Sequence, residues 1–280
     1  MSTMFAKLGR NGSAGLVLTV LLVVVAVTAW LGFTPFDPVA QHVGERLQGP
    51  SGGNWFGTDQ FGRDVASRTF AGIGTSLRVA LFAVAIAAIV GGCLGIAAGF
   101  VGRALDAVIG RVTDVLFAFP AILLALAIVA GLGHGWMNTA IAIAVVYTPI
   151  FVRVARGPTL AVRNAEYVQA GRVLGYSLPR LLARHVLPNV APAIVVQVML
   201  ALSWAIITES GLSFLGLGTQ PPEPSLGGMV NEARSLMTEA WWLMAFPAGV
   251  IVLAVIALNL LGDGLRTALD PRGVHERSVT

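Results

Sequence analysis

The sequence has little charge, a single lysine and a single cysteine, and each of these shortages excludes a class of protein. Charged residues make up 11% of the chain and apolar residues 56%. A soluble domain carries roughly 25% charged residues, so the composition predicts an integral membrane protein. Lys7, the only lysine, does not follow a Gly-x-x-x-x-Gly pattern, which excludes a Walker-type phosphate-binding loop. Cys93 alone forms neither an internal disulfide nor a cysteine metal cluster, and we expect it to pack as a small apolar residue.

Patterns typical of enzymes and of metal sites are also missing from the sequence. It contains no Gly-x-Ser-x-Gly elbow and no His-Glu-x-x-His motif. The histidines are scattered over separate loops and the C-terminal tail, which disfavours a metal site; they are His42, His134, His185 and His275. We therefore expect no catalytic residue, no bound cofactor and no metal in this chain.

What the sequence does contain is a set of apolar runs long enough to cross a bilayer, which takes about 20 residues each. These runs are Ala14–Phe33, Leu77–Val101, Val112–Leu132, Trp136–Val154, Ala191–Leu215 and Leu243–Leu261. The first is longer than the apolar core of a signal peptide and precedes no clear cleavage site, so we interpret it as an anchor. The predicted fold is an all-α integral membrane protein with about six transmembrane helices.

These runs divide the chain into segments. The predicted segments are an N-terminus (1–13), a first transmembrane helix (14–33), an outer loop (34–76), a five-helix core (77–263) that includes a long loop (156–190), and a tail (264–280). With the N-terminus inside, the inner segments hold 13 of the 18 basic residues. The outer segments hold only Arg46, Arg63, Arg68, Arg78 and Arg234.

The distribution of basic residues predicts the orientation, because cytoplasmic segments carry an excess of lysine and arginine. Both termini and the 156–190 loop are therefore predicted to be cytoplasmic. The net positive charge is then mostly a property of topology. No nucleic-acid-binding motif accompanies it, so we expect no nucleic-acid partner.

Two acidic residues lie within or near the apolar runs. Asp114 is at the inner start of the third run, and Glu209 is in the outer half of the fifth. An ionisable group at membrane depth is costly and suggests a role in a translocation path. The alternative is that each carboxylate pairs with an arginine or with backbone groups at a helix contact. Arg111 lies three residues before Asp114 and supports this alternative there, whereas Glu209 has no charged neighbour within a helical turn.

A polar, arginine-rich segment, Glu166–Pro188, separates two apolar runs and is patterned like a folded element. Asn164 is placed to cap a first helix, and Gly175 suits the left-handed residue that ends one. Ser177 is placed to cap a second helix, which Pro188 is expected to end. Two short helices joined by a turn within the inner loop predict a docking surface.

The spacing within this segment has a counterpart in a known family. Gln169-Ala170-Gly171 is followed after three residues by Gly175 and, after nine more, by His185-Val-Leu187-Pro188. This resembles the cytoplasmic motif of the inner-membrane permease subunits of bacterial ABC importers, in the dipeptide, oligopeptide and nickel branch. That motif reads Glu-Ala-Ala, three residues, Gly, nine residues and Ile-x-Leu-Pro. Gln169, Gly171 and His185 replace family residues and leave the spacing intact.

Further blocks resemble the second permease subunit of the peptide branch, in the same order and between the same spans. They are Phe36-Asp-Pro38, Phe56-Gly-Thr-Asp-Gln-Phe-Gly-Arg-Asp-Val-Ala-Ser-Arg68, Leu212-Ser-Phe-Leu-Gly-Leu-Gly218 with Gln220-Pro-Pro222, and Gly262-Asp-Gly-Leu-Arg266 with Leu269-Asp-Pro271. The resemblance covers nearly the whole chain. It implies a type I ABC importer permease fold with cytoplasmic coupling helices, in the cytoplasmic membrane of a bacterium.

The resemblance also implies partners for this chain. They are a second, homologous permease subunit, two ATP-binding subunits that hold ATP and Mg²⁺, an extracytoplasmic substrate-binding protein and membrane lipid. The residues it assigns to ATPase coupling are Glu166, Tyr167, Val168, Gln169, Ala170, Gly171, Arg172, Leu174, Gly175, Arg180, Leu181, Arg184, Leu187 and Pro188. The arginines among them would orient the docked ATPase, or they reflect only the positive-inside bias.

The implied function is to form half of a translocation path for dipeptides or short oligopeptides. Nickel or a nickel chelate, glutathione and other small solutes remain alternative cargoes. An ion-coupled secondary transporter or a non-transporting scaffold would be a different class of protein. The outer loop is either a platform for the binding protein or the partner permease, or a cap held by its own ion pairs. Its paired charges are Asp59, Arg63, Asp64 and Arg68, and the loop 216–242 is a second candidate contact.

Overall fold

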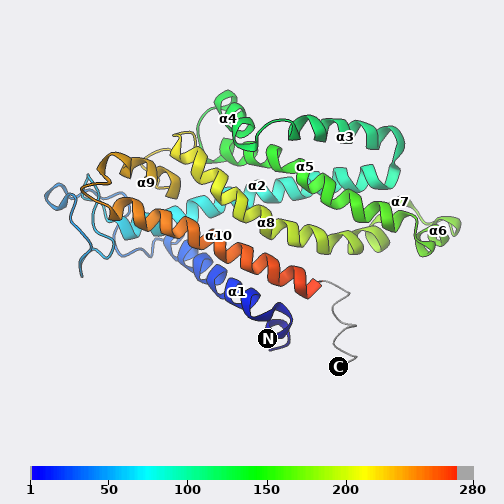
Figure 1. Cartoon of the computed structure of the whole chain (residues 1–280), viewed down its shortest axis with the longest axis horizontal. Helices are drawn as coiled ribbons and strands as arrows, with labels where there is room; N and C mark the ends of the chain where they lie inside the picture. The colour runs from blue at the N-terminus through cyan, green and yellow to red at the C-terminus, as the bar shows by residue number, and fades with distance from the viewer. Residues whose placement is uncertain (1, 270–280) are drawn as a thin grey trace.

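The chain folds into a bundle of helices (Figure 1). The computed structural model describes residues 2–269, so Asp270 and Pro271 of the last sequence block lie outside the described residues. The elements are α1 (Ser2–Trp30), η1 (Val43–Glu45), α2 (Val65–Val101), α3 (Arg103–Phe117), α4 (Ala121–Leu132), α5 (Trp136–Arg163), α6 (Glu166–Val173), α7 (Leu178–Leu181), η2 (Leu182–Val186), α8 (Leu187–Phe214), α9 (Leu226–Ala233), η3 (Arg234–Leu236) and α10 (Trp242–Leu269). Within the described residues the only strand-like feature is an isolated bridge between Thr58 and Asp64.

Most of the predicted transmembrane runs form single long helices. Within residues 2–269, five helices are long and apolar enough to cross a membrane: Leu8–Trp30 within α1, α2, α5, the continuous helix Leu178–Phe214, and α10. The third predicted run, Val112–Leu132, is instead divided between α3 and α4, which meet at 94° and form at most one broken span. The chain breaks fully at Phe119-Pro120. Pro120 lacks the N–H that would continue α3, and it occupies the N-cap position of α4.

Glycines let the two most extensively packed helices, α2 and α5, approach closely. Gly91, Gly95 and Gly99 are spaced four residues apart along α2 and are all buried. A Cβ built on Gly91 would lie 2.5 Å from the carbonyl oxygen of Thr148, and one on Gly99 would lie 2.9 Å from Cβ of Thr159. Since these positions face α5 with no side chain, the backbones pack directly, as small residues allow in membrane helices.

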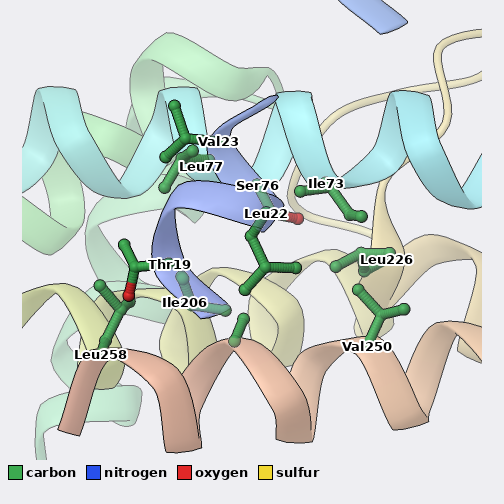
Figure 2. A pocket seen from close by; sticks show the side chains of 11 residues that line it. Thr19, Leu22, Val23, Ile73, Ser76, Leu77, Ile206, Leu226, Val250 and Leu258 are labelled. Carbon is green, nitrogen blue, oxygen red and sulfur yellow. The ribbon is translucent and has the colours of Figure 1, made fainter. Parts of the chain in front are cut away.

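The first helix packs lengthwise against the last one in the same way. A Cβ on Gly12 of α1 would lie 2.6 Å from Cα of Gly264 in α10. Nearer the middle of the bundle, α1, α2, α8, α10 and the first residue of α9 surround a cavity of about 30 Å³ (Figure 2). Thr19 and Ser76 are its polar lining residues. The hydroxyl of Thr19 is buried and has no hydrogen-bond partner among the described residues.

The two ends of the bundle differ in structure. α6 and α7 lie at one end, and α9 lies at the opposite end together with the loop that joins α1 to α2 (Figure 1). We call these the α6 end and the α9 end. Helix α2 begins at Val65, inside the predicted outer loop. Asp64 caps it by accepting a 2.7 Å hydrogen bond from the N–H of Ser67.

A cluster of buried charges holds the α1–α2 loop at the α9 end. Nε of Arg63 lies 2.6 Å from Oδ2 of Asp59, and both side chains are 6% exposed. Glu232 of α9 accepts from Arg63 at 3.0 Å and from Arg68 at 3.2 Å. The loop therefore folds as a cap with ion pairs to α2 and α9, and its use as a platform for a partner stays a prediction. Glu232, distant in sequence, completes the cluster.

Candidate functional site

The polar segment forms two short helices at the α6 end, with ends that differ in detail from those expected. The first helix, α6, begins at Glu166 after Ala165, and its N-cap makes no side-chain hydrogen bond. Asn164, the predicted cap, instead follows the last residue of α5, and its carbonyl accepts from Nε2 of Gln169 at 3.3 Å. Ser177 does occupy the N-cap position of α7, without a side-chain capping bond.

Gly175 ends α6 in the predicted left-handed conformation, with φ of +76°. The N–H of Tyr176 donates to the carbonyl of Gly171 at 3.0 Å, and the N–H of Gly175 donates to the carbonyl of Arg172 at 3.0 Å. This pair of hydrogen bonds is the Schellman arrangement, which satisfies the last carbonyls of a helix. The turn between the two helices is therefore rigidly defined by backbone geometry.

The second helix of the polar segment, α7, does not lead to a helix end at Pro188, contrary to the sequence prediction. The chain passes from α7 through η2, a π-helical turn, into α8, and Pro188 lies in the first turn of α8. A proline inside a helix lacks an N–H and clashes with the carbonyl four residues earlier. The wider π-helical turn directly before it accommodates both defects. Leu178–Phe214 is consequently one continuous helix, which connects the short α7 directly to a membrane-spanning segment.

An apolar core attaches this element to the rest of the bundle. Val168 of α6 and Leu181 of α7 are 0% and 3% exposed, and they pack with Phe100 of α2 and Ala155 of α5. Gly171 makes the close contact of α6 and α7 possible, because a Cβ there would lie 2.9 Å from Cδ2 of Leu181. The family motif has alanine at this position, and glycine replaces it here because a Cβ would be too close to Leu181. Val168 and Leu181 hold the element together and are not available at its surface.

The outer surface of the element is unusually apolar. Val173 is 88% exposed and Leu174 is 71% exposed at the tip, and Tyr167, Leu178 and Leu187 are each about half exposed. Sequence reasoning named Tyr167, Leu174 and Leu187 but missed Val173 and Leu178. Val173 adjoins Leu174 and Leu178 adjoins Ser177, so the two residues flank the predicted turn. That position could have identified them from the sequence. We call Val173, Leu174 and Leu178 the apolar tip.

Polar residues surround the apolar tip. The guanidinium of Arg172 lies 4.6 Å from the centre of the Phe100 ring, and that of Arg180 lies 5.5 Å from the centre of the Tyr176 ring. Arginine stacked on an aromatic ring keeps its charge and most of its hydrogen-bond donors available. The remaining residues that the resemblance assigned, Glu166, Gln169, Ala170, Arg184 and Pro188, are exposed.

The two acidic residues considered for a translocation path lie in different settings. Oδ1 of Asp114 in α3 is 2.9 Å from the guanidinium of Arg153 in α5, and both side chains are more than half exposed. The partner is Arg153, not the neighbouring Arg111. Beside it, Asp106 binds Arg156 of α5 through two hydrogen bonds of 2.5 and 2.7 Å. These ion pairs connect α3 to α5.

Glu209 of α8 is completely buried within the chain. Its Oε1 accepts a 2.7 Å hydrogen bond from the hydroxyl of Ser213, one turn further along the helix. Nearby, the hydroxyls of Tyr147 and Thr208 are 2.9 Å apart and link α5 to α8. Glu209 and Asp114 therefore have separate partners on separate helices. A role for either in a translocation path stays a prediction.

Comparison with known proteins identifies the family. The sequence profile of the family described as binding-protein-dependent transport system inner membrane component matches residues 91–274. The chain belongs to this family. The matched residues include the C-terminal end of α2 from Gly91, the whole element from α6 to η2, and all of α10. The family match therefore covers the apolar tip and the part of the bundle from the end of α2 to α10.

Individual relatives of this permease match along almost their whole length. It is 42% identical over 270 residues to the dipeptide transport system permease protein DppC of Alkalihalophilus pseudofirmus, covering 96% of this chain and 88% of the relative. It is 43% identical over 254 residues to the glutathione transport system permease protein GsiD of Pectobacterium atrosepticum, covering 90% and 84%. It is 38% identical over 266 residues to the probable D,D-dipeptide transport system permease protein DdpC of Escherichia coli, covering 95% and 89%.

Proposed function

We propose that this permease forms half of a translocation path for dipeptides or short oligopeptides, paired with a second, homologous permease subunit. The observation that carries this proposal is the similarity to permeases named for dipeptide and peptide transport, which extends over nearly the whole chain. The permease belongs to an ABC importer, and ATP and Mg²⁺ would be bound by two partner ATPase subunits. An extracytoplasmic binding protein would deliver the cargo to the α9 end.

The apolar tip is the proposed contact with an ATPase subunit. A protein surface that exposes Val173 and Leu174 to water at 88% and 71% is unfavourable unless another protein covers it. Arg172 and Arg180 flank the tip and would orient the partner, because charges at the rim of an interface determine register more than affinity. The same arrangement supports a cytoplasmic α6 end, as the positive-inside bias predicts.

Movement of the tip would reach the membrane through α8. The α7 helix, η2 and α8 form one continuous helix from Leu178 to Phe214, so a displacement of Leu178 would pass to the membrane span without an intervening loop. Ion pairs from α5 to α3 and the buried core around Val168 and Phe100 connect the same end of the bundle to α2, α3 and α5. Nucleotide-driven closure of two ATPases would then rock these helices between inward-open and outward-open states, as rigid parts move in other transporters.

Binding of the ATPase subunits tests this assignment. We expect Val173→Asp to abolish co-elution of the ATPase subunits with the permease pair, because it places a charge in an apolar contact. Val43→Asp is the matched control, since Val43 is 64% exposed but lies in the α1–α2 loop at the opposite end. If Val173→Asp retains the ATPases as well as Val43→Asp does, the apolar tip is not the docking surface.

Glutathione is the second candidate cargo, because a permease named for glutathione transport is 43% identical over 90% of this chain. Glutathione is itself a short peptide, so the two cargoes share backbone amides and terminal charges. Uptake of a labelled dipeptide in the presence of excess unlabelled glutathione distinguishes them. Strong inhibition by glutathione, with weak inhibition by unlabelled dipeptide, would replace the dipeptide assignment with a glutathione one.

A further inference from the structure

A large groove opens between α1 and α2 near the α9 end. It has a volume of about 690 Å³, within the range of small-molecule sites. Its walls are mainly apolar and include Val27 and Trp30 of α1 and Leu81, Phe82 and Ala85 of α2. Leu81, Phe82 and Ala85 are exposed along one side of the helix. The groove thus presents an apolar channel on the outside of the described bundle.

Two opposite charges lie at one position along this channel. The guanidinium of Arg78 is 3.5 Å from Oε1 of Glu223, and these side chains are 37% and 53% exposed. The same guanidinium lies 4.4 Å from the centre of the Trp136 ring. The Nε–H of Arg78 is buried and has no acceptor in the part of the chain that the structure describes. A donor without an acceptor is unfavourable and indicates a missing hydrogen-bond partner.

The charged pair lies where the membrane surface is expected. From Val79 to Val101, α2 has no charged residue, a stretch of about 34 Å at 1.5 Å per residue and therefore long enough to cross the hydrocarbon core. Arg78 directly precedes this stretch and stacks on Trp136, the first residue of α5. Tryptophan is enriched at membrane interfaces. The pair is thus at headgroup level, with the apolar part of the groove extending from it into the bilayer.

We propose that this groove binds one phospholipid with a zwitterionic headgroup and a primary ammonium, that is, a phosphatidylethanolamine. The phosphate would accept from Arg78, and the ammonium would donate to Glu223. One acyl chain would lie along Leu81, Phe82 and Ala85. Glu223 disfavours a purely anionic lipid, whose headgroup offers no cation to it. A quaternary choline has no N–H donor, so it makes the weaker contact.

The apolar wall beyond the charged pair favours a lipid over a small zwitterion such as a dipeptide. The lining on α2 extends from Arg78 to Ala85 on that side, about 10 Å along the helix axis. Leu81, Phe82 and Ala85 offer no polar group there. The backbone of a dipeptide would leave its polar groups against this wall, whereas the first part of an acyl chain is apolar throughout.

Native mass spectrometry of the intact importer complex tests the proposal. Phosphatidylethanolamine, phosphatidylcholine and phosphatidylglycerol with identical acyl chains are the probes, and retained adducts are compared. The wild type is expected to retain phosphatidylethanolamine in preference to both others. Arg78→Gln is expected to weaken that binding about tenfold or more, since a hydrogen bond to a charged group is lost. Arg78→Lys should retain most of the binding, and Glu223→Gln should abolish the preference for ethanolamine.

Arg234→Gln is the matched control, because Arg234 is an exposed arginine at the same end of the bundle but outside the groove. Its lipid adducts should equal those of the wild type. A phosphatidylethanolamine with a photoreactive acyl chain should crosslink to peptides containing Leu81 or Phe82. Equal retention of all three lipids, an unchanged preference in Glu223→Gln, or displacement of the lipid by a dipeptide would overturn the proposal. A photoreactive side chain placed at Leu81 or Phe82 that crosslinks to the partner permease in place of lipid would also overturn it. None of these outcomes depends on transport.

Discussion

Replacing Gly91 by alanine measures how closely α2 and α5 pack. The added Cβ would lie 2.5 Å from the carbonyl oxygen of Thr148 and 2.7 Å from Cβ of Phe151. Ordinary contacts begin near 3.4 Å, so the helices must separate locally by about 0.9 Å. A gap of this size removes a quarter to a half of the dispersion energy of each affected contact. We expect the overpacking to cost about 1–3 kcal/mol.

Alanine also has an intrinsic advantage over glycine in a helix, about 0.5–1 kcal/mol. Gly249→Ala isolates this effect, because Gly249 is exposed in α10 and a Cβ there would meet no atom within 4 Å. We therefore expect Gly249→Ala to stabilise the permease slightly and Gly91→Ala to destabilise it by about 1–2 kcal/mol. Because the intrinsic advantage of alanine is common to both variants, the difference between them should equal the overpacking cost, about 1–3 kcal/mol.

The assay is the midpoint of thermal unfolding in one detergent, followed by size-exclusion chromatography of heated samples. The lower stability of Gly91→Ala should appear as a midpoint several degrees below that of Gly249→Ala. If Gly91→Ala unfolds at the same temperature as Gly249→Ala or higher, the backbones of α2 and α5 are not in the described contact.

Three further predictions concern other contacts. Glu232→Gln should lower the free energy of unfolding by about 2 kcal/mol, because it leaves two buried arginines with one carboxylate. Asp114→Asn should change it by less than about 1 kcal/mol, because the Asp114–Arg153 pair is exposed. Equal effects of the two variants in the same unfolding assay would contradict this difference in burial. Thr19→Val should be neutral or stabilising by up to about 1 kcal/mol, because it removes a buried hydroxyl without a described hydrogen-bond partner. A clear loss of stability would show that this hydroxyl does make a hydrogen bond. Gly175→Ala should cost about 1–2 kcal/mol at its positive φ, seen as faster proteolysis between α6 and α7, and unchanged proteolysis would contradict the turn geometry.

The sequence predicted local geometry well where a single residue type determines it. Gly175 adopts the left-handed conformation because other residues are strained there. The apolar runs form helices because their length and composition allow little else in a bilayer. The Gln169-to-Pro188 spacing correctly indicated the family, since the family profile includes those residues.

Features that depend on distant residues could not be predicted in the same way. Glu232 completes the ion cluster of Arg63 and Arg68 only because α9 folds back onto the α1–α2 loop. Asp114 pairs with Arg153 across two helices, although Arg111 is nearer in sequence. The helix passes through Pro188 because a π-helical turn forms just before it, and no local pattern indicated that turn. Whether a side chain such as Val168 or Val173 is buried or exposed likewise depended on how α6 packs.

Uptake by proteoliposomes tests the central claim most directly. The vesicles would contain this permease, its partner permease and two ATPase subunits, with the binding protein and a labelled dipeptide outside and ATP inside. We predict accumulation of the dipeptide that requires ATP and is lost in Val173→Asp but retained in Val43→Asp. Accumulation driven by this chain alone, in vesicles without ATP or ATPase subunits, would contradict the account.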